Sequence, residues 1–253
     1  TDTLLVPTMV NMTVNHPSVA DYDLSSLRHL AYGASPMPEA VIMRAMQVMP
    51  DVQFYHAYGQ TECAPLTSVN GPESHVFDGP MANMYRSCGR SAPGVMVEIR
   101  DENDQEVPRG EVGEICVRGA NVMQGYWKLP ELTAETLRGG WLHSGDGGYM
   151  DENGYIYVVD RVKDMIISGG ENIYSAEVES AVQMFPAVAE CAVIGIPDEK
   201  WGEAVHAIVR LKEGESATEE AIITHCREQI AGFKCPRSVA FVTEALPLSL
   251  IHI

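Results

Sequence analysis

Positive charge is scarce in this chain of 253 residues. There are 17 Lys and Arg against 35 Asp and Glu, which gives a formal net charge of −18. Binding to the phosphates of nucleic acids needs clustered Lys and Arg, so this balance argues against a nucleic-acid partner. A site for a small phosphate-containing ligand would have few Lys and Arg side chains available to bind the phosphate.

Long apolar runs and paired cysteines are also missing. The run from Ala187 to Ile196 is too short to span a bilayer and contains Glu190. Because no basic-then-apolar signal opens the chain, we expect a cytoplasmic protein without a transmembrane segment. No C-x-x-C pair occurs, which predicts reduced, mostly buried thiols rather than a disulfide framework or a zinc site. The six cysteines are Cys63, Cys88, Cys116, Cys191, Cys226 and Cys235.

The first part of the chain has an α/β pattern. Strands are predicted over 27–32 and 52–58, with a helix over 38–49 between them. A strand–helix–strand unit with short connections predicts a parallel sheet covered by helices. From about Gly89 short β runs alternate with turns, which predicts a small antiparallel, barrel-like unit with strands over 95–100, 113–117 and 155–159.

A second αβ pattern begins after Arg161. Ser175 and Thr218 are predicted to cap two helices, which end near Met184 and Ile230. Strands are predicted over 188–196, 204–211 and 239–242. We therefore place a domain boundary between residues 161 and 162.

Two motifs carry the most information. The run Tyr58-Gly59-Gln60-Thr61-Glu62 follows a predicted strand and presents a hydroxyl beside a carboxylate. The second motif runs from Arg161 to Ile173 and contains the pair Gly169-Gly170. Together they resemble the adenylate-forming family, which includes acyl-CoA synthetases, firefly luciferase and the adenylation domains of peptide synthetases. The sequence around both motifs is most similar to the fatty-acid branch.

The resemblance implies a reaction and an organisation. Such enzymes activate a carboxylic acid with ATP and Mg²⁺ and then transfer the acyl group to coenzyme A. Residues 1–161 would be the later part of the large AMP-binding domain, and 162–253 the mobile C-terminal domain beyond a hinge. The expected partners are the small-molecule acid, ATP and CoA; the sequence has no signal for an oligomeric state.

This resemblance implies that four short segments bind the nucleotide. The loop Gly33-Ala34-Ser35 would lie against adenine and the acyl pocket, and the Tyr58 ring, followed by Gly59, would face the purine. Asp146 would accept hydrogen bonds from the ribose hydroxyls, and Arg161 would also reach the ribose.

Catalysis is assigned to Thr61, Glu62 and Lys163. Mg²⁺ prefers oxygen ligands, so Glu62 at the carboxyl end of a strand is the predicted metal ligand, and the Thr61 hydroxyl could bind a phosphate oxygen. Lys163 occupies the family's hinge position, where a short segment absorbs the domain rotation.

The CoA side of the cleft has weaker candidates. Gly169 and Gly170 would line the pantetheine path, although a plain β-hairpin explains them equally well. Lys234 could meet CoA or be an ordinary surface lysine. His56 is interpreted as a core or pocket-lining histidine, and Arg90 as structural.

The sequence departs from the family pattern in two places. It contains no Ser/Thr/Gly-rich phosphate loop, and after Leu246-Pro247-Leu248-Ser249 it reads Leu250-Ile251-His252-Ile253, without the family's terminal lysine. We expect truncation at both ends and little adenylating activity from this chain alone. The alternatives are an aryl-acid ligase, a peptide-synthetase adenylation domain, a luciferase-like oxygenase, or a non-catalytic module that binds a nucleotide or CoA.

Overall fold

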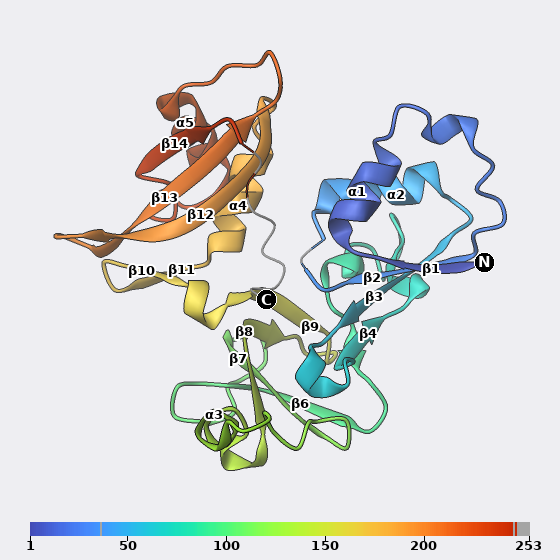
Figure 1. The fold of residues 1–253 in the computed structure, drawn as a ribbon, viewed down its shortest axis with the longest axis vertical. Coiled ribbons are helices and arrows are strands. Elements are labelled where there is room, and N and C mark those ends of the chain that lie inside the picture. The colour runs from blue at the N-terminus through green and yellow to red at the C-terminus, as the bar shows by residue number, and fades with distance from the viewer. Residues whose placement is uncertain (36, 245, 247–253) are drawn as a thin grey trace. The chain divides into compact units, whose positions relative to one another are not determined.

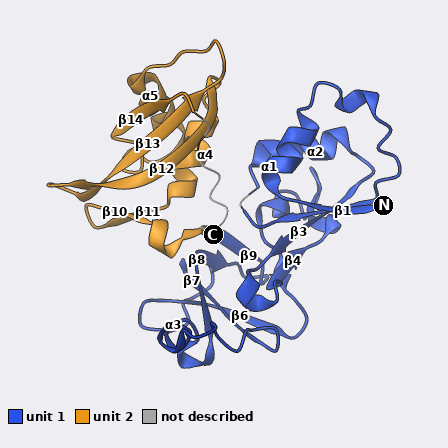
Figure 2. Ribbon diagram, viewed as in Figure 1, with its two compact units in different colours: residues 1–158 blue, residues 159–253 orange. Residues whose placement is uncertain are grey.

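The computed structural model describes residues 1–35, 37–244 and 246 of the chain. It divides into two compact units, Thr1–Val158 and Val159–Ile253 (Figure 2). The division falls inside the strand β9 (Ile156–Arg161), slightly before the boundary expected between 161 and 162. Each unit has a hydrophobic core of its own.

The first sheet of the first unit has the order β1-β2-β3-β4-β5 (Figure 1). Its strands are β1 (Asp2–Leu5), β2 (His29–Gly33), β3 (Gln53–Tyr58), β4 (Ser68–Asn70) and β5 (Arg90–Ser91). β2 and β3 are parallel, as the strand–helix–strand pattern predicted. β1, which was not predicted, is also parallel to β2, whereas β4 and β5 join in antiparallel fashion.

Two helices, α1 (Pro7–Val14) and α2 (Glu39–Val48), pack against this sheet. Val10, Ile42 and Ala45 from the helices share one buried cluster with Leu30 and Phe54 from the strands. Helical spacing of apolar residues on one side of α2 explains this packing, because residues three or four positions apart lie on one face.

The second sheet of the first unit has the order β6-β7-β8-β9. It contains β6 (Val95–Arg100), β7 (Gly113–Gly119), β8 (Leu142–Met150) and β9, with the short helix α3 (Pro130–Thr136) before β8. The described strands form an open order, not the closed ring that a barrel would require. β8 was not predicted, because its three glycines are unusual in a strand.

The second unit contains the sheet order β11-β10-β13-β12, with β14 pairing alongside β13. Its elements are β10 (Ile166–Ser168), β11 (Glu171–Ile173), α4 (Ser175–Gln183), β12 (Val188–Asp198), β13 (Gly202–Leu211), α5 (Glu219–Gln229) and β14 (Ser238–Val242). The long hairpin β12–β13 is antiparallel and β14 adds in parallel. Val178, Val205, Val209 and Ile222 lie in its core.

One of the two predicted helix caps is confirmed and the other is wrong. The Thr218 hydroxyl accepts a hydrogen bond from the backbone N–H of Ala221 at 3.2 Å, at the start of α5. Ser175 instead lies inside α4 and donates its hydroxyl to Asp160 Oδ2 at 2.7 Å. The Ala176 N–H donates to the same oxygen at 3.2 Å, so a carboxylate from β9 satisfies this helix start.

Candidate functional site

The end of β3 delivers the predicted catalytic pair. Tyr58 is the last residue of β3, and Thr61 and Glu62 begin the 3-10 helix η2 (Thr61–Cys63). The chain then folds back, so that the Thr67 N–H donates to the Tyr58 carbonyl at 2.8 Å. A Cβ on Gly59 would lie 2.0 Å from the carbonyl oxygen of Pro65, so this close approach requires glycine.

The loop after β2 leaves the sheet at the same edge. β2 and β3 are parallel, with Gly33 opposite Ala57, so their carboxyl ends lie side by side. A Cβ on Gly33 would come within 2.1 Å of the Ala57 carbonyl oxygen. Ala34 has a positive φ of 70° and turns the chain away from the sheet. The predicted adenine loop, Gly33 to Ser35, is thus next to Tyr58 and Gly59, at the edge where such sheets bind ligands.

Glu62 is held by a segment that the sequence did not single out. The Tyr126 hydroxyl donates to Glu62 Oε1 at 2.7 Å, and the Met123 N–H donates to the Glu62 carbonyl at 2.8 Å. Asn121 Nδ2 donates to the Cys63 carbonyl at 2.9 Å. Burial raises the pKa of Tyr126, and the hydrogen bond to Glu62 raises it further, so the phenol stays a donor. Tyr126 lies in a loop, where no periodicity could mark it.

The chemistry around Glu62 suits Mg²⁺. A half-buried carboxylate, oriented by a neutral hydroxyl, lies beside the exposed Thr61. These are oxygen donors of the kind that Mg²⁺ combines with substrate phosphates. The residues present therefore fit the predicted metal, and the role of Glu62 as its ligand stays a prediction.

Asp146 meets Tyr58 although 88 positions separate them in the sequence. The Tyr58 hydroxyl donates to Asp146 Oδ2 at 2.8 Å. Burial, followed by the negative charge of Asp146, raises the pKa of Tyr58 well above its ordinary value. Asp146 lies in the strand β8, so this contact joins the two sheets of the first unit. The residue expected to face the purine and the residue expected to bind the ribose are thus neighbours.

The other predicted site residues lie in the second unit. Arg161 ends β9, and Lys163 is exposed in the 3-10 helix η6 (Val162–Asp164). Gly169 and Gly170 form the turn of the β10–β11 hairpin, with positive φ values of 64° and 85°. The roles given to these four residues in the hinge, at the ribose and on the CoA path stay predictions.

Lys234 is engaged inside the second unit. Its Nζ lies 2.7 and 2.8 Å from the two carboxylate oxygens of Glu177. CoA would have to compete with this partly exposed ion pair, which is of a kind that contributes little. The predicted contact with CoA stays a prediction.

His56 and the cysteines behave as expected. His56 is buried, its Nδ1 donates to the Ser87 carbonyl at 3.0 Å, and its ring stacks on Tyr32 with centroids 4.8 Å apart. It is therefore a core histidine. All six cysteines are free thiols, and Cys191 alone among them is not fully buried. Arg90 lies over the Tyr155 ring at 4.5 Å, a structural contact.

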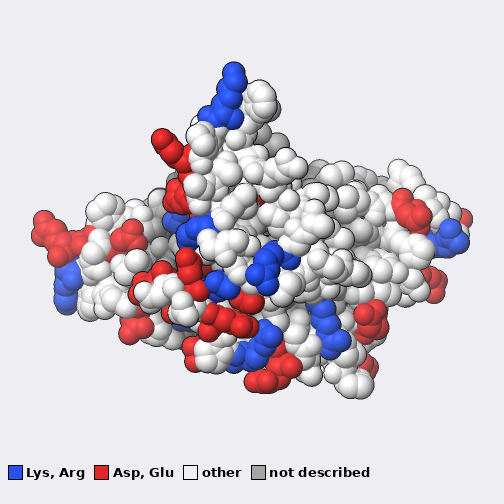
Figure 3. Space-filling model, turned by 90° about the horizontal axis from the view of Figure 1, so that it is seen from below, with Lys and Arg blue, Asp and Glu red and all other residues white. Residues whose placement is uncertain are grey.

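Two further expectations concern charge and membranes. Acidic and basic side chains are interspersed on the face drawn in Figure 3, which has no broad area of Lys and Arg among its described residues. Within the described part of the chain, no helix combines the length and the apolar character needed to cross a bilayer. The divergent ending, residues 250–253, lies outside the described residues, as do Pro36, Ala245 and residues 247–249.

Known proteins resemble the chain over nearly its whole length. It is 45% identical over 242 residues to a feruloyl-CoA synthase of Amycolatopsis sp, covering 96% of this chain and 48% of the relative. A long-chain-fatty-acid–CoA ligase of Escherichia coli O6:H1 is 41% identical over 96% of this chain and 42% of its own. The amide bond synthetase McbA from Marinactinospora thermotolerans superimposes with a TM-score of 0.86 at 37% identity, over 96% of this chain and 48% of that one.

The chain thus spans about half the length of the curated relatives that it matches. Two family models cover most of it: AMP-binding enzyme over residues 1–127, and AMP-binding enzyme C-terminal domain over residues 177–249. The first motif, Tyr58 to Glu62, lies inside the first of these ranges, and the α/β architecture agrees with that of the similar solved structure. The chain belongs to the AMP-binding enzyme family, the adenylate-forming family that its motifs predicted.

Proposed function

We propose that this chain supplies the adenosine-binding and metal-binding part of a cytoplasmic, ATP-dependent acyl-CoA synthetase. The observation that carries the proposal is the hydrogen bond of 2.8 Å between Tyr58 and Asp146. An aromatic face and a carboxylate set side by side match the two halves of adenosine, a flat base and a sugar diol.

Each predicted site residue of the first unit has a role in this proposal. The Tyr58 ring packs against adenine beside the loop Gly33 to Ser35, and Asp146 accepts hydrogen bonds from the ribose hydroxyls. The Thr61 hydroxyl donates to a phosphate oxygen. Glu62, oriented by Tyr126, holds Mg²⁺, which offsets the charge of the phosphates.

The reaction has two steps. An oxygen of the carboxylic acid attacks the α-phosphorus of ATP, and pyrophosphate leaves, giving an acyl-adenylate. The CoA thiol then attacks the acyl carbon, its proton passes to solvent, and AMP leaves. Lys163 would be the hinge between these steps, with Gly169, Gly170 and Lys234 toward CoA.

For the acid substrate we propose only a chemical class, an aliphatic or aryl carboxylic acid. The similar proteins include one named for ferulic acid and one named for long-chain fatty acids, and the amide bond synthetase points to a different acceptor. Aryl-acid ligation, peptide-synthetase adenylation and nucleotide binding without catalysis therefore stay as alternatives.

Calorimetry with AMP tests the binding part of the proposal. We expect AMP to bind the chain, and Asp146→Asn to weaken that binding about tenfold, since hydrogen bonds to a charged group contribute on the order of 1.5–3 kcal/mol. Asp51→Asn, an exposed aspartate before β3, is the matched control and should bind like the unmodified chain. Absence of AMP binding, or equal affinity in both variants, would overturn the proposal.

Pyrophosphate exchange tests whether this chain adenylates an acid by itself. The chain is mixed with ATP, Mg²⁺, labelled pyrophosphate and either a fatty acid or ferulic acid. We expect little exchange, because the sequence contains neither the phosphate loop nor the terminal lysine of the family, and each such stabiliser is worth roughly 100- to 1000-fold in rate. Robust exchange would show that the chain is itself a competent adenylating enzyme.

A further inference from the structure

Asp146 lies in a bulge of β8. β7 and β8 pair regularly up to Glu114 opposite Gly147, and pairing resumes with Cys116 opposite His143. Between these pairs, one residue of β7 faces three of β8: Ser144, Gly145 and Asp146. Bulges re-aim side chains and leave backbone N–H groups without their ladder partners.

Side chains replace the missing ladder partners. Glu114 Oε1 accepts the Gly145 N–H at 2.9 Å, and Ser144 Oγ accepts the Asp146 N–H at 3.1 Å. Gly145 has a positive φ of 75°, which turns the chain at the centre of the bulge. The carboxylate of Glu114 therefore bonds to the residue immediately before Asp146.

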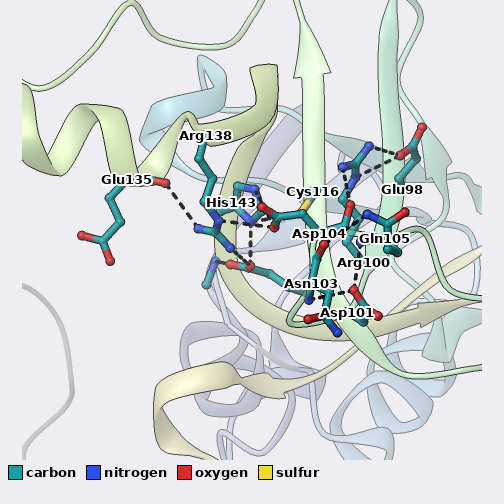
Figure 4. A network of polar contacts seen from close by, with 12 residues as sticks. Glu98, Arg100, Asp101, Asn103, Asp104, Gln105, Cys116, Glu135, Arg138 and His143 are labelled. Atoms are coloured by element: carbon teal, nitrogen blue, oxygen red, sulfur yellow. Dashed lines mark hydrogen bonds and ion pairs between the residues drawn. The ribbon is translucent and has the colours of Figure 1, made fainter.

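Two side chains, His143 and Arg138, hold the Glu114 carboxylate in place. His143 Nδ1 lies 2.8 Å from its Oε2, and Arg138 Nη2 lies 3.3 Å from the same oxygen. Arg138 Nε also donates to Asp104 Oδ1 at 3.3 Å, which connects the group to the turn after β6 (Figure 4). Glu114 is thus braced from one side and bonds to the bulge on the other.

The same group could be taken for a metal site. Ligand atoms of Glu114, Cys116 and His143 lie within 4.8 Å of one another. However, Arg138 already provides positive charge against the Glu114 carboxylate, and a guanidinium beside a metal ion would repel it. Burial, followed by the charge of Glu114, raises the pKa of Cys116 to about 12, so the thiol is neutral beside the Glu114 carboxylate. The group is a hydrogen-bonded brace.

We propose that Glu114 is a positioning residue: it holds the β8 bulge so that Asp146 faces Tyr58 and the ribose of a bound nucleotide. The contact between Asp146 and the ribose rests on the proposed function. The bulge and its hydrogen bonds are observed in the structure. Glu114 itself does not touch the nucleotide in this proposal.

The test compares AMP with 2′,3′-dideoxy-AMP, which lacks both ribose hydroxyls. Affinities of both are measured by calorimetry for the unmodified chain, Glu114→Ala, Glu114→Gln and Asp146→Asn. We expect Glu114→Ala to weaken AMP about tenfold and to leave the dideoxy nucleotide unchanged, because only the contact to the diol is lost. Glu114→Gln keeps an acceptor for Gly145 and should retain most of the preference for AMP.

Glu98→Ala is the matched control. Glu98 is a carboxylate on the neighbouring strand β6, paired with Arg100 at 2.6 Å, and it makes none of the bulge contacts described above. It should keep the preference for AMP. A variant with both Glu114→Ala and Asp146→Asn should bind AMP no more weakly than Asp146→Asn alone, since both changes remove the same contact.

A second measurement does not depend on the nucleotide. Amide hydrogen exchange of Gly145, followed by NMR, should speed up at least about tenfold in Glu114→Ala and not in Glu98→Ala, because the Gly145 N–H loses its acceptor. Unchanged exchange, or a preference for AMP that survives Glu114→Ala, would overturn the role of Glu114. If the unmodified chain fails to distinguish the two nucleotides while Gly145 exchange responds as expected, the ribose assignment is wrong and the bracing of the bulge stands.

Discussion

The hydroxyl of Tyr58 donates a hydrogen bond of 2.8 Å to Asp146, from the end of one sheet to the bulge of another. Tyr58 ends the parallel strand β3, and Asp146 belongs to β8 of the four-stranded sheet. One bond therefore links the two layers that would enclose adenosine. Because Tyr58 is partly buried and its pKa is raised, the hydroxyl keeps its proton near neutral pH and remains a donor to the carboxylate.

Removing this hydroxyl should cost stability more than it costs base binding. We expect Tyr58→Phe to lower the free energy of unfolding by about 1–3 kcal/mol, because the partly buried carboxylate of Asp146 loses a donor. The Phe ring still offers a flat face to adenine, so AMP affinity should fall further in Tyr58→Leu. Urea unfolding and calorimetry measure the two effects.

The control for Tyr58 is Tyr55→Phe on the same strand. Tyr55 donates to the neighbouring Gln53 at 3.4 Å, a long bond at the surface. Its loss should change the free energy of unfolding by less than about 0.5 kcal/mol. Equal stability losses in the two variants would contradict a special role for the bond from Tyr58 to Asp146.

The Tyr126 hydroxyl should tune metal binding at Glu62. In Tyr126→Phe the carboxylate loses the donor at 2.7 Å that orients it, and we expect Mg²⁺ to support ATP binding about tenfold less well, as is common when a partner of a metal ligand is removed. The measurement is ATP affinity as a function of Mg²⁺ concentration. ATP affinity without Mg²⁺ should not change; a loss there as large as in its presence would point to general disruption instead.

Gly33 should not tolerate a side chain. A methyl group at this position would lie 2.1 Å from the carbonyl oxygen of Ala57 on the adjacent strand. Because the backbone fixes the position of a Cβ atom, only a shift of the backbone could relieve this contact. We expect Gly33→Ala to destabilise the chain by about 2 kcal/mol or more in urea unfolding. Gly232→Ala is the control, because a Cβ there meets no atom within 4 Å. A Gly33→Ala variant as stable as the control would contradict the close approach of β2 and β3.

Acid should destabilise the first unit through His56. Burial lowers the pKa of His56 to about 4, and nearby His75, also buried, has a lowered pKa as well. Above about pH 6.5, His56 is neutral in the folded and unfolded chains, so its contribution to stability is complete. Between pH 6.5 and 4 the unfolded chain takes up the proton and the folded chain does not, so the contribution is lost as pH falls.

The expected loss from His56 alone is up to about 3 kcal/mol across that pH range. Urea midpoints at pH 7, 5.5 and 4.5 measure it, and His56→Gln should flatten the dependence. His16→Gln, at an exposed position, should leave the dependence unchanged. A His56→Gln variant with the full acid sensitivity would show that other groups are responsible.

Much of the fold could be predicted from local sequence patterns. The helix around Ala45, the strand ending at Tyr58 and the cap at Thr218 were all predicted, because each depends on spacing or on a contact three residues away. Where a partner comes from elsewhere in the chain, prediction failed. Ser175 was predicted to cap α4, but the oxygen that satisfies this helix start comes from Asp160 in β9.

The strand β8 shows the same limit. Glycine has a low strand propensity, so Gly145, Gly147 and Gly148 argue against a strand when only the sequence is considered. In the structure, Gly145 has the positive φ of the bulge. A Cβ on Gly148 would lie 2.4 Å from the Tyr157 carbonyl oxygen. Asp146 was identified from its motif, while its place in a bulge came only from the register with β7.

The sequence by itself determined the family, the α/β class and the chemical types at the site, because motif, periodicity and capping are properties of neighbouring residues. The tertiary structure decided which of those residues meet: Tyr58 with Asp146, Glu62 with Tyr126, and Glu114 with Gly145. Such pairs lie 88, 64 and 31 positions apart. Hydrogen bonds act over about 3 Å, and only the packing of sheets and loops brings positions so distant in sequence within that range.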